Sequence, residues 1–121
     1  MRVLIVEDEA LLAMMLEDMV REAGHEVVGV AADGAGAQGL ARRERPDVVL
    51  MDINIRGEMD GVEAARRLRR LAPFRIIFIT AYTDEANQAR MQAVDPVAVL
   101  SKPYDARLLS ETLARVAGDE G

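Results

Sequence analysis

The sequence predicts an α/β protein, with a mostly parallel sheet covered by helices on both faces. Two observations favour this fold class. Five short aliphatic runs alternate with five helix-like segments along the chain, which requires right-handed crossovers between parallel strands. Several of these runs are apolar at every position instead of alternating with polar residues. That pattern is typical of strands that are buried on both faces.

The aliphatic runs are the expected strands, and the clearest of them ends at Asp52 after four consecutive apolar residues. The strands are predicted at residues 2–6, 26–31, 47–52, 75–79 and 97–100. The second run is the weakest, so we expect it nearer an edge of the sheet. Thr80 follows the fourth run directly, and Ser101, Lys102 and Pro103 follow the fifth.

Apolar residues recur at helical spacing in the first and in the last of the five helix-like segments. Acids at 7–9 suit the N-terminal dipole of the first helix, and Gly24 is expected to end it. Its predicted apolar stripe comprises Leu12, Met15, Leu16, Met19 and Val20. The last helix begins at Asp105 and is predicted to bury Leu108, Leu109, Leu113 and Val116.

The three middle helices are expected to begin at capping aspartates. Asp33 precedes a helix of small residues, and Pro46 ends the connection that follows it. Asp60 precedes a helix that runs to Leu71, with an inward face formed by Val62, Ala65, Leu68 and Leu71. The segment 84–94 is predicted to be a polar helix with few strong apolar anchors.

Length and composition limit the class of protein. We expect 121 residues to form one domain, over 1–117, with a short tail at 118–121. The absence of cysteine excludes disulfides and thiolate metal sites and fits a cytoplasmic location. No apolar segment is long enough to cross a bilayer. A net charge of −6 and only four aromatic residues argue against contact between this domain and nucleic acid.

Polar side chains stand just past the carboxyl ends of four of the five expected strands. They are Glu7, Asp8, Asp52, Thr80 and Lys102. In open α/β sheets ligands bind at this edge, so we expect all five side chains to meet there.

Three carboxylates that converge without a counter-ion repel one another, which indicates a cation site. No cysteine is present, and the single histidine, His25, is distant from these strand ends. A set of oxygen donors selects a hard cation such as Mg²⁺, which takes one or two carboxylates together with waters and phosphate oxygens. We expect Asp8 and Asp52 to bind Mg²⁺, with Glu7 bound directly or through water.

The remaining side chains complete a site suited to phosphoryl transfer. Lys102 is a compact positive charge that could meet a phosphoryl oxygen, and Thr80 supplies a hydroxyl donor. Asp52 is then placed as a nucleophile that forms an acyl phosphate. Such a transfer needs mostly positioning and charge neutralisation.

In order and spacing, four motifs resemble those of the response-regulator receiver domains of two-component systems, over residues 2–117. The motifs are Val6-Glu7-Asp8-Glu9, Val49-Leu50-Met51-Asp52, Ile79-Thr80-Ala81 and Lys102-Pro103. The resemblance implies a doubly wound (βα)5 three-layer sandwich, with the flavodoxin-like strand order 2-1-3-4-5. It also implies Mg²⁺-dependent phosphoryl transfer onto Asp52 from a histidine kinase or histidine phosphotransfer protein.

The family resemblance assigns further roles. It implies the main-chain carbonyl of Asn54 as the third protein metal ligand and a cis peptide between Lys102 and Pro103. It also implies that the face formed by the fourth helix, the last strand and the last helix binds partners. A homodimer could form through this face, with charged contacts from Arg90, Arg107, Glu111 and Arg115.

The sequence departs from the family pattern at two places. An aromatic residue often stands three positions before the lysine, where this chain has Val99. A switch at Thr80 must then work without that ring, although Tyr82 could substitute in part. The loop 53–60 has Arg56 where the commoner pattern has proline, and it reaches its Asp-Gly one residue later. Loop geometry and the dephosphorylation rate are therefore not carried over.

Other function classes fit less well. A haloacid-dehalogenase-type phosphatase would need a second acid at position 54 and a cap domain. A nucleotide or flavin binder would need a Gly- or Ser/Thr-rich loop in place of the acids at 7–9. A receiver-like domain that works without phosphorylation, or the N-terminal fragment of a longer regulator, stays open. We expect a stand-alone phosphoacceptor switch, not an enzyme, that assists its own phosphorylation and dephosphorylation and signals to a downstream protein.

Overall fold

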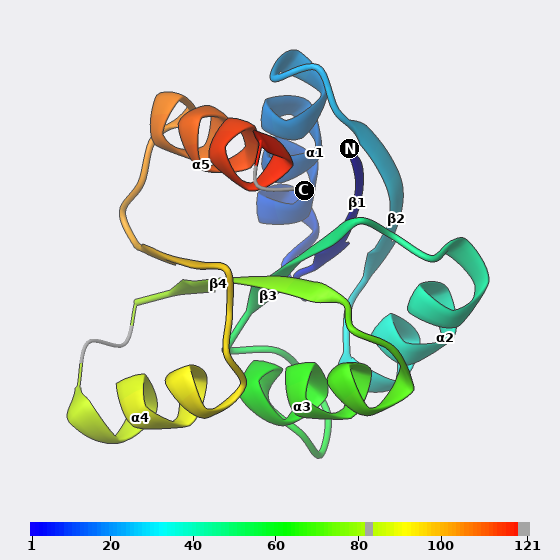
Figure 1. Ribbon diagram of the computed structural model, residues 1–121, viewed down its shortest axis with the longest axis vertical. Coiled ribbons are helices and arrows are strands. Elements are labelled where there is room, and N and C mark those ends of the chain that lie inside the picture. The colour runs from blue at the N-terminus through cyan, green and yellow to red at the C-terminus, as the bar shows by residue number, and fades with distance from the viewer. Residues whose placement is uncertain (82–83, 119–121) are drawn as a thin grey trace.

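A computed structural model of the protein describes residues 1–81 and 84–118 and contains a five-stranded parallel sheet (Figure 1). The strands are β1 (Arg2–Val6), β2 (Glu26–Ala31), β3 (Val48–Asp52), β4 (Arg75–Thr80) and β5 (Ala98–Ser101). The helices are α1 (Ala10–Glu22), α2 (Gly34–Glu44), α3 (Gly61–Leu71), α4 (Glu85–Ala93) and α5 (Ala106–Gly118). Every strand is followed by a helix, as the alternating pattern predicts.

The strand order is β2-β1-β3-β4-β5, which confirms the predicted doubly wound, flavodoxin-like topology. β3 is central and pairs in parallel with β1 on one side and β4 on the other. All five of its residues are buried, as expected for a run of apolar residues that ends on a carboxylate. β2 lies at an edge, and its pairing with β1 shifts register between Val3 and Leu4. The weak apolar pattern of residues 26–31 therefore matches an edge strand.

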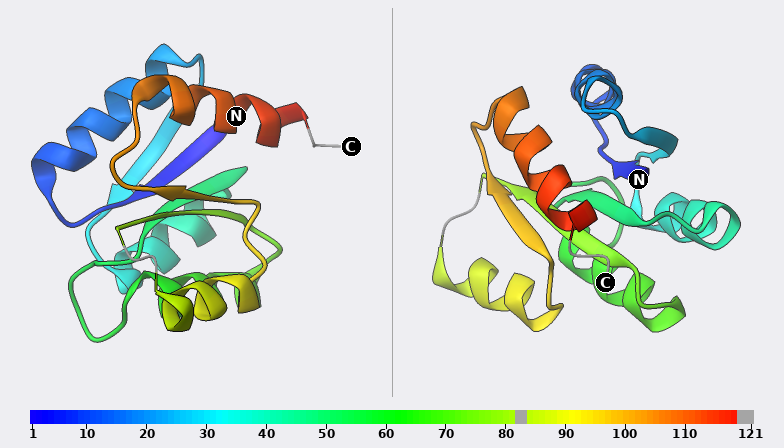
Figure 2. Two further views of the ribbon diagram at one scale, coloured as in Figure 1. Left: turned by 90° about the vertical axis from the view of Figure 1, so that its left-hand side faces the viewer. Right: turned by 45° about the horizontal axis from the view of Figure 1, so that its top comes forward.

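Two hydrophobic clusters lie on opposite faces of the sheet (Figure 2). α1 and α5 cover one face, where Leu16 and Leu113 pack beneath them. α2, α3 and α4 cover the other face, which includes Leu68 and Met91. The molecule is thus a three-layer sandwich. None of the helices in the described part of the chain is long and apolar enough to cross a bilayer.

Three residues of the predicted inward faces are exposed instead. Met15 of α1, Leu71 of α3 and Leu108 of α5 are 46%, 37% and 43% exposed. Met15 and Leu108 lie at the borders of their apolar stripes, where an ideal helical pattern does not decide on which side of the boundary a residue falls. Leu71 is the last residue of its helix, beyond the part that lies on the sheet.

The ends of the last strand and of the last helix differ slightly from the predicted bounds. β5 begins at Ala98 and includes Ser101, one residue later than the predicted strand at both ends. Gly118, the first residue of the expected tail, is the last residue of α5. The rest of that tail, residues 119–121, lies outside the described residues, as does Tyr82.

Candidate functional site

The carboxyl ends of β1, β3, β4 and β5 bring the predicted site residues to one edge of the sheet. Glu7 follows β1, Asp52 ends β3, Thr80 ends β4 and Lys102 follows β5. Glu7 and Asp52 are each 4% exposed, and Thr80 is 2% exposed. A charged or hydroxyl side chain is rarely buried this deeply without a partner, so their contacts define the site.

Lys102 forms an ion pair with Asp52 across the sheet. Its Nζ donates to Oδ2 of Asp52 at 2.8 Å. The Lys102-Pro103 peptide is cis, as the family resemblance implies, and the Lys102 main-chain N–H donates to the carbonyl of Thr80 at 2.8 Å. Burial acts to lower the pKa of Lys102, but the hydrogen bond and the charge of Asp52 outweigh burial and raise it. Lys102 is therefore charged at neutral pH and places a positive charge against Oδ2 of Asp52.

The second oxygen of Asp52 also has a partner. Oδ1 accepts a hydrogen bond of 2.8 Å from the main-chain N–H of Asn54. The two oxygens are thus oriented separately, one toward Lys102 and one toward the loop that follows β3. This orientation fixes the rotamer of the carboxylate before any substrate arrives.

Glu7 is a buried carboxyl group next to Asp52. Its pKa is raised to about 7, first by burial and then by its hydrogen bond with Asp52. A hydrogen bond of 3.0 Å from the Glu9 main-chain N–H to Oε2 of Glu7 opposes this rise. Glu7 is thus partly protonated at neutral pH, which is the expected behaviour of a buried carboxyl group that lies beside a second one.

Asp8 lies at the outer side of the site. Its side chain is 20% exposed, and Oδ2 lies 3.7 Å from Nε of Arg56. Arg56 occupies the position at which the sequence departs from the commoner proline, and an isolated parallel bridge joins it to Asp33. The guanidinium is 75% exposed, so the ion pair is weak and a cation could replace it.

The turn at Asp60-Gly61 packs against the end of β3 at Asp52. The main-chain N–H of Gly61 donates to the carbonyl of Ile53 at 2.7 Å. A Cβ at Gly61 would lie 2.1 Å from the carbonyl oxygen of Asp52, a distance that no side chain tolerates. Glycine at this position allows the start of α3 to contact the end of β3 directly.

Thr80 and Val99 face α4 across a hollow of about 240 Å³, which Gln88, Met91, Gln92 and Ser101 also line. Val99 is half-buried and packs against the hydrophobic core. The predicted switch residues Thr80 and Val99 are therefore neighbours next to α4. Tyr82, the third predicted switch residue, lies outside the described residues.

Tyr104 is a member of the site that the sequence analysis did not identify. It lines a hollow of about 280 Å³ with Glu7, Lys102 and apolar residues of α1. Burial, followed by the charges of Glu7 and Asp52, raises its pKa to about 12. Its place two residues after Lys102 was the available signal.

The donor set fits Mg²⁺. In the described part of the chain no three histidine, cysteine, aspartate or glutamate side chains form a closed cluster for a metal ion. Mg²⁺ does not require one, because it keeps several waters and binds one or two carboxylates. The raised pKa of Glu7 indicates that positive charge would be accommodated beside Asp52.

Comparison with known proteins gives one consistent family. The sequence profile of the response regulator receiver domain matches residues 3–114. The chain is 33% identical over 117 residues to the chemotaxis protein CheY of Thermotoga maritima and covers 97% of that protein. It is also 42% identical over 105 residues to the transcriptional regulatory protein PdtaR of Mycobacterium tuberculosis. That match includes 85% of the chain, which spans only half the length of PdtaR.

Solved structures agree in fold. The signal receiver domain of a modulated diguanylate cyclase from Desulfovibrio desulfuricans superposes with a TM-score of 0.88 and 38% identity, covering 97% of this chain and 93% of that one. The chemotaxis protein CheY4 of Vibrio cholerae superposes with a TM-score of 0.86 and 31% identity, covering 95% of this chain and 97% of that one.

Proposed function

Because the chain belongs to the response regulator receiver family, we propose that it accepts a phosphoryl group on Asp52 from a histidine kinase or a histidine phosphotransfer protein. The observation that carries this proposal is the buried Asp52, whose Oδ2 accepts a hydrogen bond of 2.8 Å from Nζ of Lys102 beside Glu7. A carboxylate with a fixed rotamer and a neighbouring cation is ready for nucleophilic attack.

The reaction is an in-line displacement at phosphorus. A carboxylate oxygen of Asp52 forms the new P–O bond while the P–N bond to the donor histidine breaks, and the imidazole nitrogen keeps the bonding electrons. In the transition state, positively charged and hydrogen-bonding groups contact the equatorial phosphoryl oxygens and stabilise their negative charge. Lys102 transfers its contact from the carboxylate to a phosphoryl oxygen, and the Thr80 hydroxyl donates to another.

The acidic residues would hold the cofactor. Asp8, Asp52 and the main-chain carbonyl of Asn54 would bind Mg²⁺, with Glu7 bound directly or through water, and the ion would neutralise charge on the phosphoryl oxygens. The same groups position a water for hydrolysis of the acyl phosphate. The protein thus assists its own phosphorylation and dephosphorylation as a switch, without turning over an external substrate.

Output is proposed to pass through contacts with a downstream protein. The surface formed by α4, β5 and α5 is the proposed partner face and the candidate homodimer interface. No contact with nucleic acid or membrane is proposed for residues 1–117, which form the proposed receiver domain. The chain matches CheY of Thermotoga maritima over 96% of its own length and 97% of that protein, which supports a receiver domain over most of this chain. The proposed location is the cytoplasm.

A receiver-like domain that binds partners without phosphorylation is the second candidate. It is favoured by Val99, which leaves a hollow next to Thr80 at the position where an aromatic ring is common in the family.

The deciding experiment is intact-mass spectrometry after incubation with acetyl phosphate, in Mg²⁺ and in chelator. The wild type is expected to gain one phosphoryl adduct in Mg²⁺ only, and Asp52→Asn is expected to gain none. Asp18→Asn, at an exposed position of α1, is the matched control and should behave as wild type. A wild-type protein that gains no adduct under any condition would favour the second candidate.

A further inference from the structure

α4 has little apolar anchoring to the rest of the protein. Of residues 85–93, all of them described, only Met91 is buried. Val94, which ends the helix, is the next residue to be buried. Segments with few buried apolar contacts open and shift at low free-energy cost. Polar contacts at the surface of α4 therefore have a large influence on where it lies.

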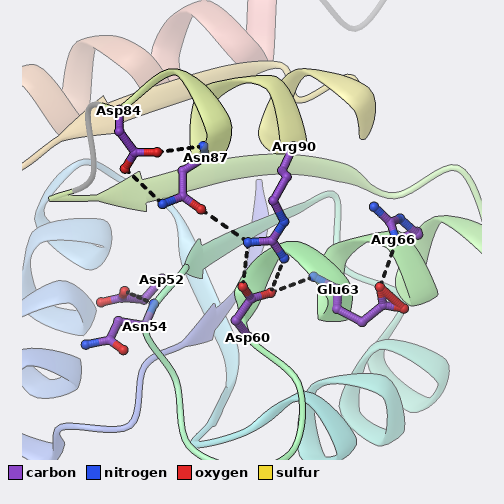
Figure 3. Close-up of polar contacts among 8 residues, drawn as sticks. All are labelled: Asp52, Asn54, Asp60, Glu63, Arg66, Asp84, Asn87 and Arg90. Carbon is purple, nitrogen blue, oxygen red and sulfur yellow. Dashed lines mark hydrogen bonds and ion pairs between the residues drawn. The ribbon is translucent and has the colours of Figure 1, made fainter.

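Arg90 joins α4 to the start of α3 through an ion pair with two contacts (Figure 3). Nη1 lies 2.8 Å from Oδ2 of Asp60, and Nη2 donates to Oδ1 at 3.0 Å. The guanidinium is also oriented from within α4, because Nη1 donates to Oδ1 of Asn87 at 3.2 Å and the Asn87 amide donates to Asp84 at 3.0 Å. A planar guanidinium that meets both carboxylate oxygens fixes direction as well as distance.

Asp60 is itself fixed at the start of α3. Its Oδ1 accepts a hydrogen bond of 3.0 Å from the Glu63 main-chain N–H, so it caps the helix. Burial acts to raise the pKa of Asp60, but the hydrogen bond from Arg90 and the one from Glu63 outweigh burial and lower it. The next residue, Gly61, contacts the main chain of Asp52 and Ile53. A continuous set of contacts therefore leads from the acceptor strand to α4.

We propose that Arg90 is a positioning residue that transmits a change at Asp52 to α4 through Asp60. The inference rests on the proposed function and specifies which contact carries the signal. Phosphorylation adds a bulky anionic group to Asp52, ends its ion pair with Lys102 and alters the hydrogen bond to Asn54 at the start of the loop 53–60. Asp60 closes that loop, so a displacement of the loop moves the carboxylate that holds Arg90.

The test measures amide hydrogen exchange of residues 85–93 before and after acetyl phosphate with Mg²⁺, with the phosphorylated fraction determined separately by intact mass. In the unphosphorylated protein, Arg90→Gln should make these amides exchange about two- to fivefold faster. In the wild type phosphorylation should change their exchange rates. In Arg90→Gln and in Asp60→Asn this phosphorylation-dependent change should fall to less than about half of the wild-type change. Arg90→Lys keeps the positive charge and should retain more of the change than Arg90→Gln. Asn preserves the cap of α3, so Asp60→Asn removes the ion pair without removing the helix start.

A matched control separates transmission from simple anchoring. Arg69 also links α3 to the end of α4, since its Nη1 donates to the carbonyl of Asp95 at 3.2 Å, but it lies at the end of α3 remote from Asp60. Arg69→Gln should leave the response to phosphorylation intact. The double variant of Arg90→Gln and Asp60→Asn should be no worse than either single variant, because the two residues act as one contact.

Each alternative result has a separate meaning. A fully phosphorylated Arg90→Gln protein whose α4 responds as in the wild type overturns the inference and leaves the proposed function standing. An equal loss of response in Arg69→Gln also overturns it, because α4 would then need only to be anchored at either end. A wild type that takes no phosphoryl group overturns the proposed function and the inference with it.

Discussion

α3 and α4 lie on the same face of the sheet but are held there by different forces. α3 buries Gly61, Val62, Ala64, Ala65 and Leu68 along one side. α4 buries one residue, and its capping aspartate and Arg90 supply the contacts that orient it. Apolar burial holds a helix over its whole length, whereas polar contacts hold it at points and can be exchanged for water or for other partners. The comparison indicates that α3 is the fixed element of this face and α4 the movable one.

The largest expected effect is at the centre of the α3 contact. Leu68→Ala should lower the free energy of unfolding by about 3 kcal/mol, because it removes a fully buried side chain and leaves a cavity. Leu71→Ala, on the same helix at an exposed position, should cost less than about 1 kcal/mol. Urea titration of both variants measures the difference. Equal losses would mean that α3 is not held by its buried face.

A smaller effect is expected at the corresponding contact of α4. Met91→Ala should lower the free energy of unfolding by about 2 kcal/mol, at the low end for a buried methionine, because α4 can move into the space. The amides of residues 85–93 should lose protection beyond what this global change explains. Hydrogen exchange under native conditions separates local from global opening. Loss of protection spread equally over α3 and α4 would contradict the distinction between the two helices.

The capping residue shared between the two helices should have an intermediate effect. Asp60→Ala removes both the cap of α3 and the ion pair with Arg90, and should cost about 1.5 kcal/mol. Asp60→Asn keeps the cap and should cost less than about 1 kcal/mol. Thermal unfolding of both variants measures the two losses of stability. If alanine and asparagine were equally damaging, the carboxylate charge and not the cap would dominate.

The smallest expected effect is a dependence on pH. The pKa of Asp60 is lowered in the folded protein, so its contribution to stability is present above its unfolded pKa, about 3.9, and is lost as pH falls through the folded value. Arg90→Gln should therefore be less stable than wild type by about 0.5 kcal/mol at pH 7. The difference should shrink below about pH 4. Unfolding curves at pH 7 and pH 3 make this comparison. If the difference in unfolding free energy between wild type and Arg90→Gln were the same at both pH values, the charge of Asp60 would not be its source.

The sequence predicted the fold and the residues at the sheet edge well, for a physical reason. Several short unbroken apolar runs such as 48–51, alternating with helical segments, are typical of buried parallel strands. Polar residues at the carboxyl ends of such strands lie at the same edge of the sheet. The order of the strands and the cis bond before Pro103 came from the family resemblance and are confirmed.

The contacts that depend on two distant side chains were not predictable in the same way. Arg90 was expected only as a charged residue of a partner face, but it binds Asp60, thirty residues earlier in the chain. No local pattern relates the two positions, because their distance depends on how α3 and α4 pack. The outward placement of Met15 was missed for another reason, because it lies at the border of an apolar stripe, where the helical pattern alone does not decide burial.

The partial protonation of Glu7 has a consequence for the binding of a cation at the carboxyl edge of the sheet. At neutral pH that proton already offsets part of the crowded negative charge beside Asp52. A divalent cation bound beside Asp52 would favour the ionised form of Glu7, so its binding would be coupled to the release of a proton. Glu7 would in this way make the binding of the cation depend on the pH of the solution, before any phosphoryl donor binds.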